Sequence, residues 1–328
     1  MSEASPPDLS GALDTVERYL LGDTPNLTQA EVCERAGVPL EVGRELWRLL
    51  GFAHLPEDAV AFTEADVAAL RYTHDLVGLG VLDAERQAAL VRTWGRSFAR
   101  LAEWQTRLLT DVALESPDPA AQVADLASEV LPRVEALQSY VWRRHLASAG
   151  NRLMASDSAD TAGSDSSTLA VVFVDIVGFT SRSKELTEGE LVQWIEHFEA
   201  ECSGLVVDHG GRVIKNIGDE VLFVADDVAA AAEAALLMTA RGSDGDDAFP
   251  AVRAGLAYGD VVSRLGDVFG PTVNVAARLT SIARPGTVLV DVGAHEALAG
   301  DEGLELRRLR RTSVKGYPHL RSWALRRS

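Results

Sequence analysis

Two aspartates in this chain stand where apolar, strand-forming segments end. Asp175 follows the run LAVVFV (169–174). Asp219 lies in a glycine-aspartate joint between two further strand-forming segments, 211–217 and 220–225. Singly, each aspartate is typical of a strand end or a turn. Two carboxylates at the ends of neighbouring strands can instead share hard cations such as Mg²⁺, which prefers oxygen ligands and also binds substrate phosphates.

A lysine and a glycine-containing loop accompany these aspartates. Lys215 occurs in the segment IKNIGDEVLF, four residues before Asp219. An ammonium group in such a strand is costly to bury without a partner. We therefore expect it to point into the cleft that contains the two aspartates. After Asp175, the sequence GFT supplies backbone N–H groups that can approach a phosphate, together with the hydroxyl of Thr180.

A second group of polar residues follows towards the C-terminus. The segment GDVFGPTVNVAARL contains Asp267, and then Asn274 and Arg278. The last two are four residues apart on a helix that a proline helps to start, so they share one face. Lys315 lies in TSVKGYP, beside a glycine. Each of these residues alone is typical of a solvated surface, but their order and spacing as a set favour a binding site.

Taken together, these motifs resemble a known family. Residues 169–325 are similar to the class III nucleotidyl cyclase homology domain, the adenylyl and guanylyl cyclase family, in FVDIVGFT, KNIGDEVLF, GDVFGPTVNVAARL and VKGYP. The resemblance implies an α+β, ferredoxin-like catalytic domain, in which an antiparallel or mixed sheet carries helices on one face. It also implies that Asp175 and Asp219 bind two Mg²⁺ or Mn²⁺ ions per site, with the carbonyl of Ile176 as a further ligand.

The same resemblance implies how a nucleotide is held. Lys215 and Asp267 are the pair that reads the purine. Asn274 positions the ribose, and Arg278 stabilises the transition state. The remaining expected substrate contacts are Phe179, Thr180 and Lys315.

The chemistry of the purine-reading pair predicts which base it accepts. Adenine presents an acceptor at N1 and a donor at its exocyclic amine, which match a lysine and an aspartate. Guanine presents the reverse order and would leave both groups unpaired. We therefore expect an adenylyl cyclase that converts ATP to cyclic AMP and pyrophosphate. Two alternatives stay open, a guanylyl cyclase and a catalytically idle protein that senses nucleotide.

Class III cyclases are pairs of catalytic domains arranged head to tail. One domain supplies the metal-binding aspartates, and the other supplies the purine, ribose and transition-state residues. Because this chain carries both sets, the resemblance implies a homodimer with two equivalent sites and an inactive monomer. Small rotations between the subunits could then open or close both sites together.

The elements that must position these residues fall into two predicted domains. The chain has 328 residues, of which 47% are hydrophobic and 24% charged, a composition typical of globular proteins. Residues 1–155 show helical periodicity almost throughout and are expected to form a regulatory domain. Residues 156–168, rich in Ser, Asp and Gly, predict a flexible linker. In residues 169–328 strand-forming segments alternate with helices, as expected for the catalytic domain.

Composition disfavours several other classes of protein. A net charge of −18 repels nucleic acid over most of the surface, so nucleic acid is not an expected partner. No apolar segment reaches the roughly 20 residues that span a bilayer, and the N-terminus has no signal segment, so we expect a cytoplasmic protein without membrane contact. The two cysteines, Cys33 and Cys202, have no partner at metal-ligand spacing.

The N-terminal half contains a further pattern. Residues 27–52, followed by 62–82, look like the helix-turn-helix of winged-helix regulators of the mercury-resistance type. The candidate recognition helix, 41–50, carries glutamates against its arginines, whereas phosphate contacts require a basic face. We therefore favour a helical packing module over DNA binding.

The order of a helical domain, a linker and a catalytic domain is similar to that of actinobacterial cyclases whose N-terminal domain inhibits or releases the catalytic dimer, in some cases with pH. His54, His74 and His145 lie in or near this half, and histidine is the side chain that titrates near neutrality. The resemblance implies autoinhibition by the N-terminal domain. We expect residues 130–153 to transmit its state to the catalytic pair.

Overall fold

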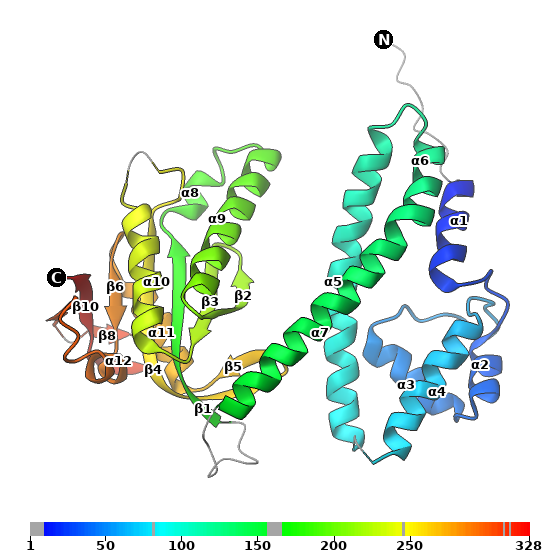
Figure 1. Ribbon diagram of the computed structural model, residues 1–328, viewed down its shortest axis with the longest axis horizontal. Helices are drawn as coiled ribbons and strands as arrows, with labels where there is room; N and C mark the ends of the chain where they lie inside the picture. Colours follow the sequence, from blue (N-terminus) through cyan, green and yellow to red (C-terminus); the bar gives the residue numbers. More distant parts are fainter. Residues whose placement is uncertain (1–9, 81–82, 156–165, 245–246, 311, 315) are drawn as a thin grey trace. The chain divides into compact units, whose positions relative to one another are not determined.

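The computed structural model describes residues 10–80, 83–155, 166–244, 247–310, 312–314 and 316–328. The chain divides into two units, residues 1–157 and 158–328 (Figure 1). Each unit has its own buried core.

The N-terminal unit is built almost wholly of helices. Its first core lies among three short helices, where Val32, Leu46 and Val67 are buried. A capping box between Thr28 and Glu31 begins the first of these helices. The elements are α1 (Ser10–Leu21), α2 (Gln29–Ala36), α3 (Leu40–Leu50), α4 (Glu64–Gly78), α5 (Ala84–Leu114), α6 (Pro119–Asp125), the π-helical turn η1 (Leu126–Val130) and α7 (Leu131–Ala155).

Two features of this unit follow from the sequence. α2 and α3 are joined by a short turn at Gly37, whose φ of 72° is readily adopted only by glycine, and together they form the expected helix-turn-helix. Close to Pro132, the structure has the π-helical turn η1 directly before α7. A proline lacks the N–H that an α-helix needs, and a π-helical turn is one way to accommodate that loss.

The C-terminal unit is a mixed sheet with helices, so the expected α+β fold class is confirmed. Its strands lie in the order β2-β3-β1-β4-β6-β10-β7, with β5 beside β4 and a separate β8-β9 hairpin. β4 and β6 are parallel, and the other neighbouring strands are antiparallel. The strands are β1 (Ser166–Ile176), β2 (Arg212–Ile217), β3 (Glu220–Ala225), β4 (Val252–Arg264), β5 (Asp267–Phe269), β6 (Val288–Val290), β7 (Leu304–Arg308), β8 (Thr312–Val314), β9 (Tyr317–Leu320) and β10 (Trp323–Arg327).

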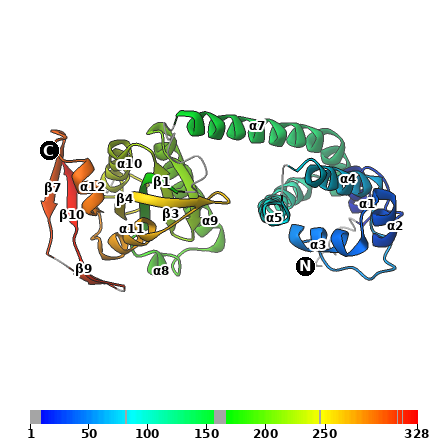
Figure 2. The same cartoon turned by 90° about the horizontal axis from the view of Figure 1, so that it is seen from below.

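Helices cover both faces of this sheet, not one face as expected. Even-numbered residues of β1 pack in a core with Phe198, Ala234 and Ala294, and odd-numbered residues pack with Ala276 on the opposite face. Figure 2 shows α10 and α11 on opposite sides of β4. The reason is that β1 is apolar on both faces, so both must be covered. The helices are α8 (Phe179–Arg182), α9 (Glu188–Asp208), α10 (Val228–Arg241), α11 (Pro271–Ile282) and α12 (Val292–Ala297).

The start of this unit differs from the predicted boundary. Residues 166–168, placed in the linker by the sequence, are the first residues of β1 and pair with residues 260–262 of β4. Their Ser and Thr composition resembles a linker, but the ladder with β4 satisfies their backbone groups. The remainder of the predicted linker, 156–165, lies outside the described residues.

Candidate active site

Strand pairing brings the two predicted metal-binding aspartates together. Asp175 is the penultimate residue of β1, and Asp219 lies in the turn between β2 and β3. The N–H of Ile176 donates to the carbonyl of Asp219 at 3.0 Å, which fastens that turn to the end of β1. β3 begins at Glu220, which stands opposite Asp175 in the β1–β3 register. Three carboxylates therefore meet at one end of the central strands.

The side chain of an arginine, Arg253, faces these carboxylates. Arg253 stands opposite Asp175 in the β1–β4 register. Its Nε and Nη2 lie 2.7 and 2.6 Å from Oδ2 of Asp175, whose side chain is only 15% exposed. Arg253 was not among the residues expected at the site. The signal for it was available, because an arginine in the apolar strand segment 251–263 raises the same question as Lys215 does.

The electrostatics of this end of the sheet favour a bound cation. Burial raises the pKa of Asp175, and Arg253 opposes that effect. Burial, followed by repulsion from Asp175 and Asp219, raises the pKa of Glu220 to about 7. Negative charge thus exceeds what Arg253 compensates, and a divalent cation would relieve the repulsion.

The donor set also suits Mg²⁺ or Mn²⁺. Among the described residues no group of three or more ligating side chains has the geometry of a complete metal site. Mg²⁺ does not require one, since it is usually held by one or two carboxylates together with substrate phosphates. The residues present therefore fit a divalent cation that shares its coordination with a nucleotide.

The predicted purine-reading residues form an ion pair. Nζ of Lys215, on β2, lies 2.5 Å from Oδ2 of Asp267, the first residue of β5. The second carboxylate oxygen accepts the backbone N–H of Val268 at 2.8 Å, which fixes the orientation of the carboxylate. The two side chains are 41% and 29% exposed, so the pair is open to a ligand.

Asn274 and Arg278 lie on one face of α11, as their spacing predicts. Asn274 is exposed and Arg278 half-buried, and among the described residues neither side chain has a recorded hydrogen-bond or ion-pair partner. α11 approaches β4 very closely at Gly255, where a Cβ would overlap the amide nitrogen of Thr280 and the carbonyl oxygen of Ala276. The helix that carries Asn274 and Arg278 is therefore seated against the sheet through that glycine.

The loop after Asp175 gives a mixed result. Gly178, with φ of 74°, begins the short helix α8, and Thr180 is exposed on it. Phe179, expected to contact substrate, is half-buried and stacks its ring on Trp194 of α9 with 5.6 Å between centroids. Its aromatic ring packs against the core, which leaves Thr180 and the backbone of this turn as the groups open to a ligand.

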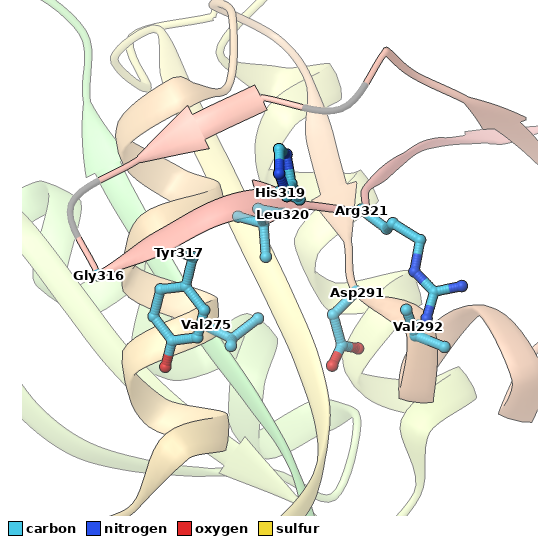
Figure 3. Close-up of a pocket in the computed structure, with 8 residues that line it drawn as sticks. All are labelled: Val275, Asp291, Val292, Gly316, Tyr317, His319, Leu320 and Arg321. Carbon is cyan, nitrogen blue, oxygen red and sulfur yellow. The ribbon is translucent and has the colours of Figure 1, made fainter.

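A cavity of about 360 Å³ lies between α11 and the β8–β9 hairpin (Figure 3). Val275 lines it from α11, next to Asn274, and Gly316 and Tyr317 line it from the other side. Lys315, the expected phosphate contact, lies outside the described residues. The cavity therefore adjoins the helix with the predicted ribose residue and does not contain the carboxylates at the end of β1.

Comparison with known proteins decides the family. A model of the adenylate and guanylate cyclase catalytic domain matches residues 163–327. The chain belongs to this cyclase family. The matched segment contains every site residue predicted from the sequence, and the described residues of this cyclase include all of them except Lys315.

Relatives of this cyclase match both of its units. An adenylate cyclase of Glutamicibacter nicotianae is 36% identical over 338 residues, covering 98% of this chain and 84% of its own. An adenylate cyclase of Streptomyces coelicolor is 41% identical over 288 residues, covering 86% of this chain and 74% of its own. A pH-sensitive adenylate cyclase of Mycobacterium tuberculosis is 32% identical over 301 residues, covering 86% and 72%. The resemblance noted in the sequence therefore extends beyond the catalytic unit.

Proposed function

We propose that this cyclase is an adenylyl cyclase that converts ATP to cyclic AMP and pyrophosphate. The observation that carries the choice of ATP is the ion pair between Lys215 and Asp267. Its lysine can donate to N1 of adenine and its carboxylate can accept from the exocyclic amine. Guanine would present a donor to the lysine and an acceptor to the carboxylate, and a site whose polar groups a ligand leaves unpaired discriminates against that ligand.

We assign the carboxylates of Asp175 and Asp219 and the carbonyl of Ile176 to two divalent cations. Both contacts between Arg253 and Asp175 are made with Oδ2 of the carboxylate, so Oδ1 is the oxygen that we assign to a cation. When bound, the cations lower the pKa of the ribose 3′-hydroxyl and neutralise charge on the triphosphate.

The remaining assigned groups hold and orient the nucleotide. Asn274 positions the ribose, and the hydroxyl of Thr180 and the backbone N–H groups after Gly178 donate hydrogen bonds to phosphate. Arg278 lies one helical turn after Asn274, and its guanidinium acts where negative charge develops on the α-phosphate. Lys315 is assigned to the phosphates from its motif.

The active unit that we propose is a head-to-tail homodimer. The side chains of Asn274 and Arg278, on α11, have no hydrogen-bond or ion-pair partner among the described residues of their own chain. They are therefore available to complete a site on a second chain. The β4–β5 hairpin adds an apolar surface for such pairing, because Val262, Leu265 and Phe269 are between 42% and 51% exposed. With both sets of residues on each chain, the dimer has two equivalent sites.

We further propose that the N-terminal unit inhibits or releases this dimer, and that the enzyme works in the cytoplasm. Within the described residues, no helix has the length and apolar character needed to cross a membrane. Deletion of residues 1–155 should raise cyclase activity and remove its dependence on pH. Unchanged activity with an unchanged pH profile after that deletion would contradict the proposed regulation.

The test of the substrate assignment compares nucleotides directly. Purified protein is incubated with ATP or GTP in Mg²⁺ or Mn²⁺, and cyclic AMP and cyclic GMP are quantified. We expect cyclic AMP alone, and a Lys215→Glu/Asp267→Cys variant should lose turnover of ATP. If the variant turns over ATP as the parent does, the purine assignment is wrong. If nucleotide binds but no cyclic product forms in any condition, the protein is the idle sensor.

A further inference from the structure

A second cavity, of about 310 Å³, lies in the N-terminal unit between the end of α3 and the middle of α5. Three arginines line it, together with small and apolar residues. They are Arg48 of α3 and Arg92 and Arg96 of α5. The described residues that line the cavity include no Asp or Glu, although the chain contains 49 acidic residues. In so acidic a protein, a cavity lined by cations alone favours an anionic ligand.

Close contact between the two helices fixes the shape of this cavity. α3 packs against α5 (Figure 1), and Gly95 is buried where they meet. A Cβ at Gly95 would lie 2.3 Å from the carbonyl oxygen of Leu50, so the two backbones are in direct contact. Arg92 and Arg96 stand three residues before and one residue after this contact, on one face of α5. Side chains on packed helices are held more precisely than side chains on loops.

Only one of the three arginines has a carboxylate partner among the described residues. Nε and Nη2 of Arg48 donate to the two carboxylate oxygens of Glu45 at 2.8 and 2.6 Å. These hydrogen bonds hold the pKa of Glu45 below its ordinary value, so Glu45 stays ionised and offsets the charge of Arg48. The side chains of Arg92 and Arg96 have no hydrogen-bond or ion-pair partner in the described part of the chain, and Arg92 acts on Glu45 only through its field. Two guanidinium groups are therefore available to a ligand.

The charge that is left over matches that of a phosphate monoester. Three guanidinium groups line the cavity, and Glu45 offsets one of them. The carbonyl end of α3 adds roughly half a negative charge, which leaves about 1.5 positive charges. A phosphate monoester carries about −1.5 to −2 at pH 7 and has three terminal oxygens, which two arginine forks can bind together. A carboxylate carries a single charge and two oxygens, so it would leave one fork without a full partner.

The size and the remaining walls of the cavity indicate an organic ester. Its volume lies at the lower end of the range of about 300–1,000 Å³ that is usual for small-molecule sites. Leu49, Leu50 and Ala99 line the cavity beside the arginines. These residues give the organic part of a small ligand an apolar surface to contact.

We infer that this cavity binds a small phosphate monoester. Arg92 and Arg96 donate to the phosphate oxygens, and Arg48 adds positive charge. A free sugar phosphate and the headgroup of phosphatidic acid share this chemistry. The site belongs to the N-terminal unit, and the inference does not depend on cyclase activity.

The test measures binding of glucose 6-phosphate to the full-length protein by isothermal titration calorimetry. EDTA is present, so that divalent cations do not hold the ester at the catalytic unit. We expect saturable binding. Arg96→Gln should raise the dissociation constant at least about tenfold, because it removes charged hydrogen bonds to the phosphate. Arg92→Gln should have an effect of the same size.

Two control variants locate the binding. Arg107→Gln also removes an arginine from α5, where Arg107 is exposed and does not line the cavity. Arg278→Gln removes an arginine from the predicted nucleotide site. Both controls should bind glucose 6-phosphate as the parent does. Circular dichroism shows whether each variant keeps its helix content.

Two further ligands define what the site recognises. Gluconate has a similar size but carries a carboxylate, and it should bind at least about tenfold more weakly than glucose 6-phosphate. Vesicles that contain phosphatidic acid separate the two sources of phosphate. If the parent sediments with these vesicles and Arg96→Gln does not, while glucose 6-phosphate fails to bind, the ligand is a lipid headgroup.

Three results would overturn the inference. In the first, neither glucose 6-phosphate nor the vesicles bind the parent. In the second, folded Arg96→Gln protein binds as tightly as the parent, which would place the ligand elsewhere. In the third, gluconate binds as tightly as glucose 6-phosphate, which would exclude phosphate as the recognised group.

Discussion

Removing the carboxylate of Asp267 should impair catalysis and leave stability almost unchanged. In the Asp267→Ala variant the exocyclic amine of adenine loses its acceptor, and Lys215 loses the partner that lies 2.5 Å away. A hydrogen bond to a charged group is worth about 1.5 to 3 kcal/mol. Since 1.4 kcal/mol corresponds to a factor of ten, kcat/KM for ATP should fall by about 10- to 150-fold.

The effect on folding should be much smaller. The two side chains are 41% and 29% exposed, so solvent screens their attraction. Exposed ion pairs contribute about 0 to 1 kcal/mol to the free energy of unfolding, and we expect the variant to lose no more than that. Urea unfolding and steady-state kinetics on the same preparation measure the two quantities.

The matched control is Asp226→Ala. Asp226 faces Arg212 at 3.9 Å near the other end of the β2–β3 hairpin, so its removal also breaks an exposed ion pair. We expect kcat/KM for ATP to stay within about twofold of the parent, because surface substitutions away from a site have small effects. Our reasoning on the purine pair fails if Asp267→Ala keeps full kcat/KM, or if it loses activity only because it unfolds.

Three further predictions follow from packing and electrostatics. Gly255→Ala should lower kcat/KM, because the added methyl group would push α11 away from β4 and displace the two polar residues on that helix. Arg241→Met should lower the free energy of unfolding at neutral pH, and this destabilisation should disappear in acid. Arg241, followed by the backbone N–H of Phe249, lowers the pKa of Asp247 from 3.8 to about 2, so the stabilisation is present above pH 4 and declines as the pH falls towards 2. Cys33 and Cys202 should resist maleimide in the native state, because burial raises the pKa of both thiols.

Each of these has a clear contrary result. The control is Gly300→Ala, at a glycine with no atom near its Cβ position but φ of 107°, which introduces backbone strain without the overlap found at Gly255. An active Gly255→Ala enzyme would contradict the seating of α11. For Arg241→Met, chemical denaturation that shows the same destabilisation at pH 5 and at the lowest accessible pH would be inconsistent with the lowered pKa of Asp247. Rapid labelling of native protein would contradict the burial of Cys33 and Cys202.

Several elements could be predicted from the sequence because one physical signal dominates them. The segments around β1 and β3 are continuous apolar runs, and their joints with polar residues mark Asp175 and Asp219. The four-residue spacing of Asn274 and Arg278 requires only a helix. Lys215 and Asp267 were matched to each other through the family resemblance, and the structure places them in contact.

Other elements could not be predicted because their signals are weak or depend on tertiary contacts. β7 and β10 are short and carry charged residues, as in LELRR and WALRR, so their strand character comes from pairing with each other. An arginine in the apolar segment 251–263 marks Arg253 as unusual, but its pairing with Asp175 depends on the register between β1 and β4, which no local pattern reveals. Phe179 follows the predicted metal site in sequence, yet its ring turns towards Trp194, because an apolar ring near a packed helix gains more from burial than from exposure.

The most direct test of the central proposal is cyclic AMP formation from ATP by the purified full-length chain, with Mg²⁺ and with Mn²⁺, beside Asp219→Ala. Asp219 is half-buried in the turn between β2 and β3, and its backbone carbonyl accepts a hydrogen bond from the N–H of Ile176. Replacing the side chain leaves this backbone hydrogen bond available. Thermal melting verifies that the variant is folded. We predict cyclic AMP from the parent and none from the variant. Equal product from a folded Asp219→Ala protein would contradict the assignment of this carboxylate to the metal, and no product from the parent under any condition would contradict the proposed enzyme.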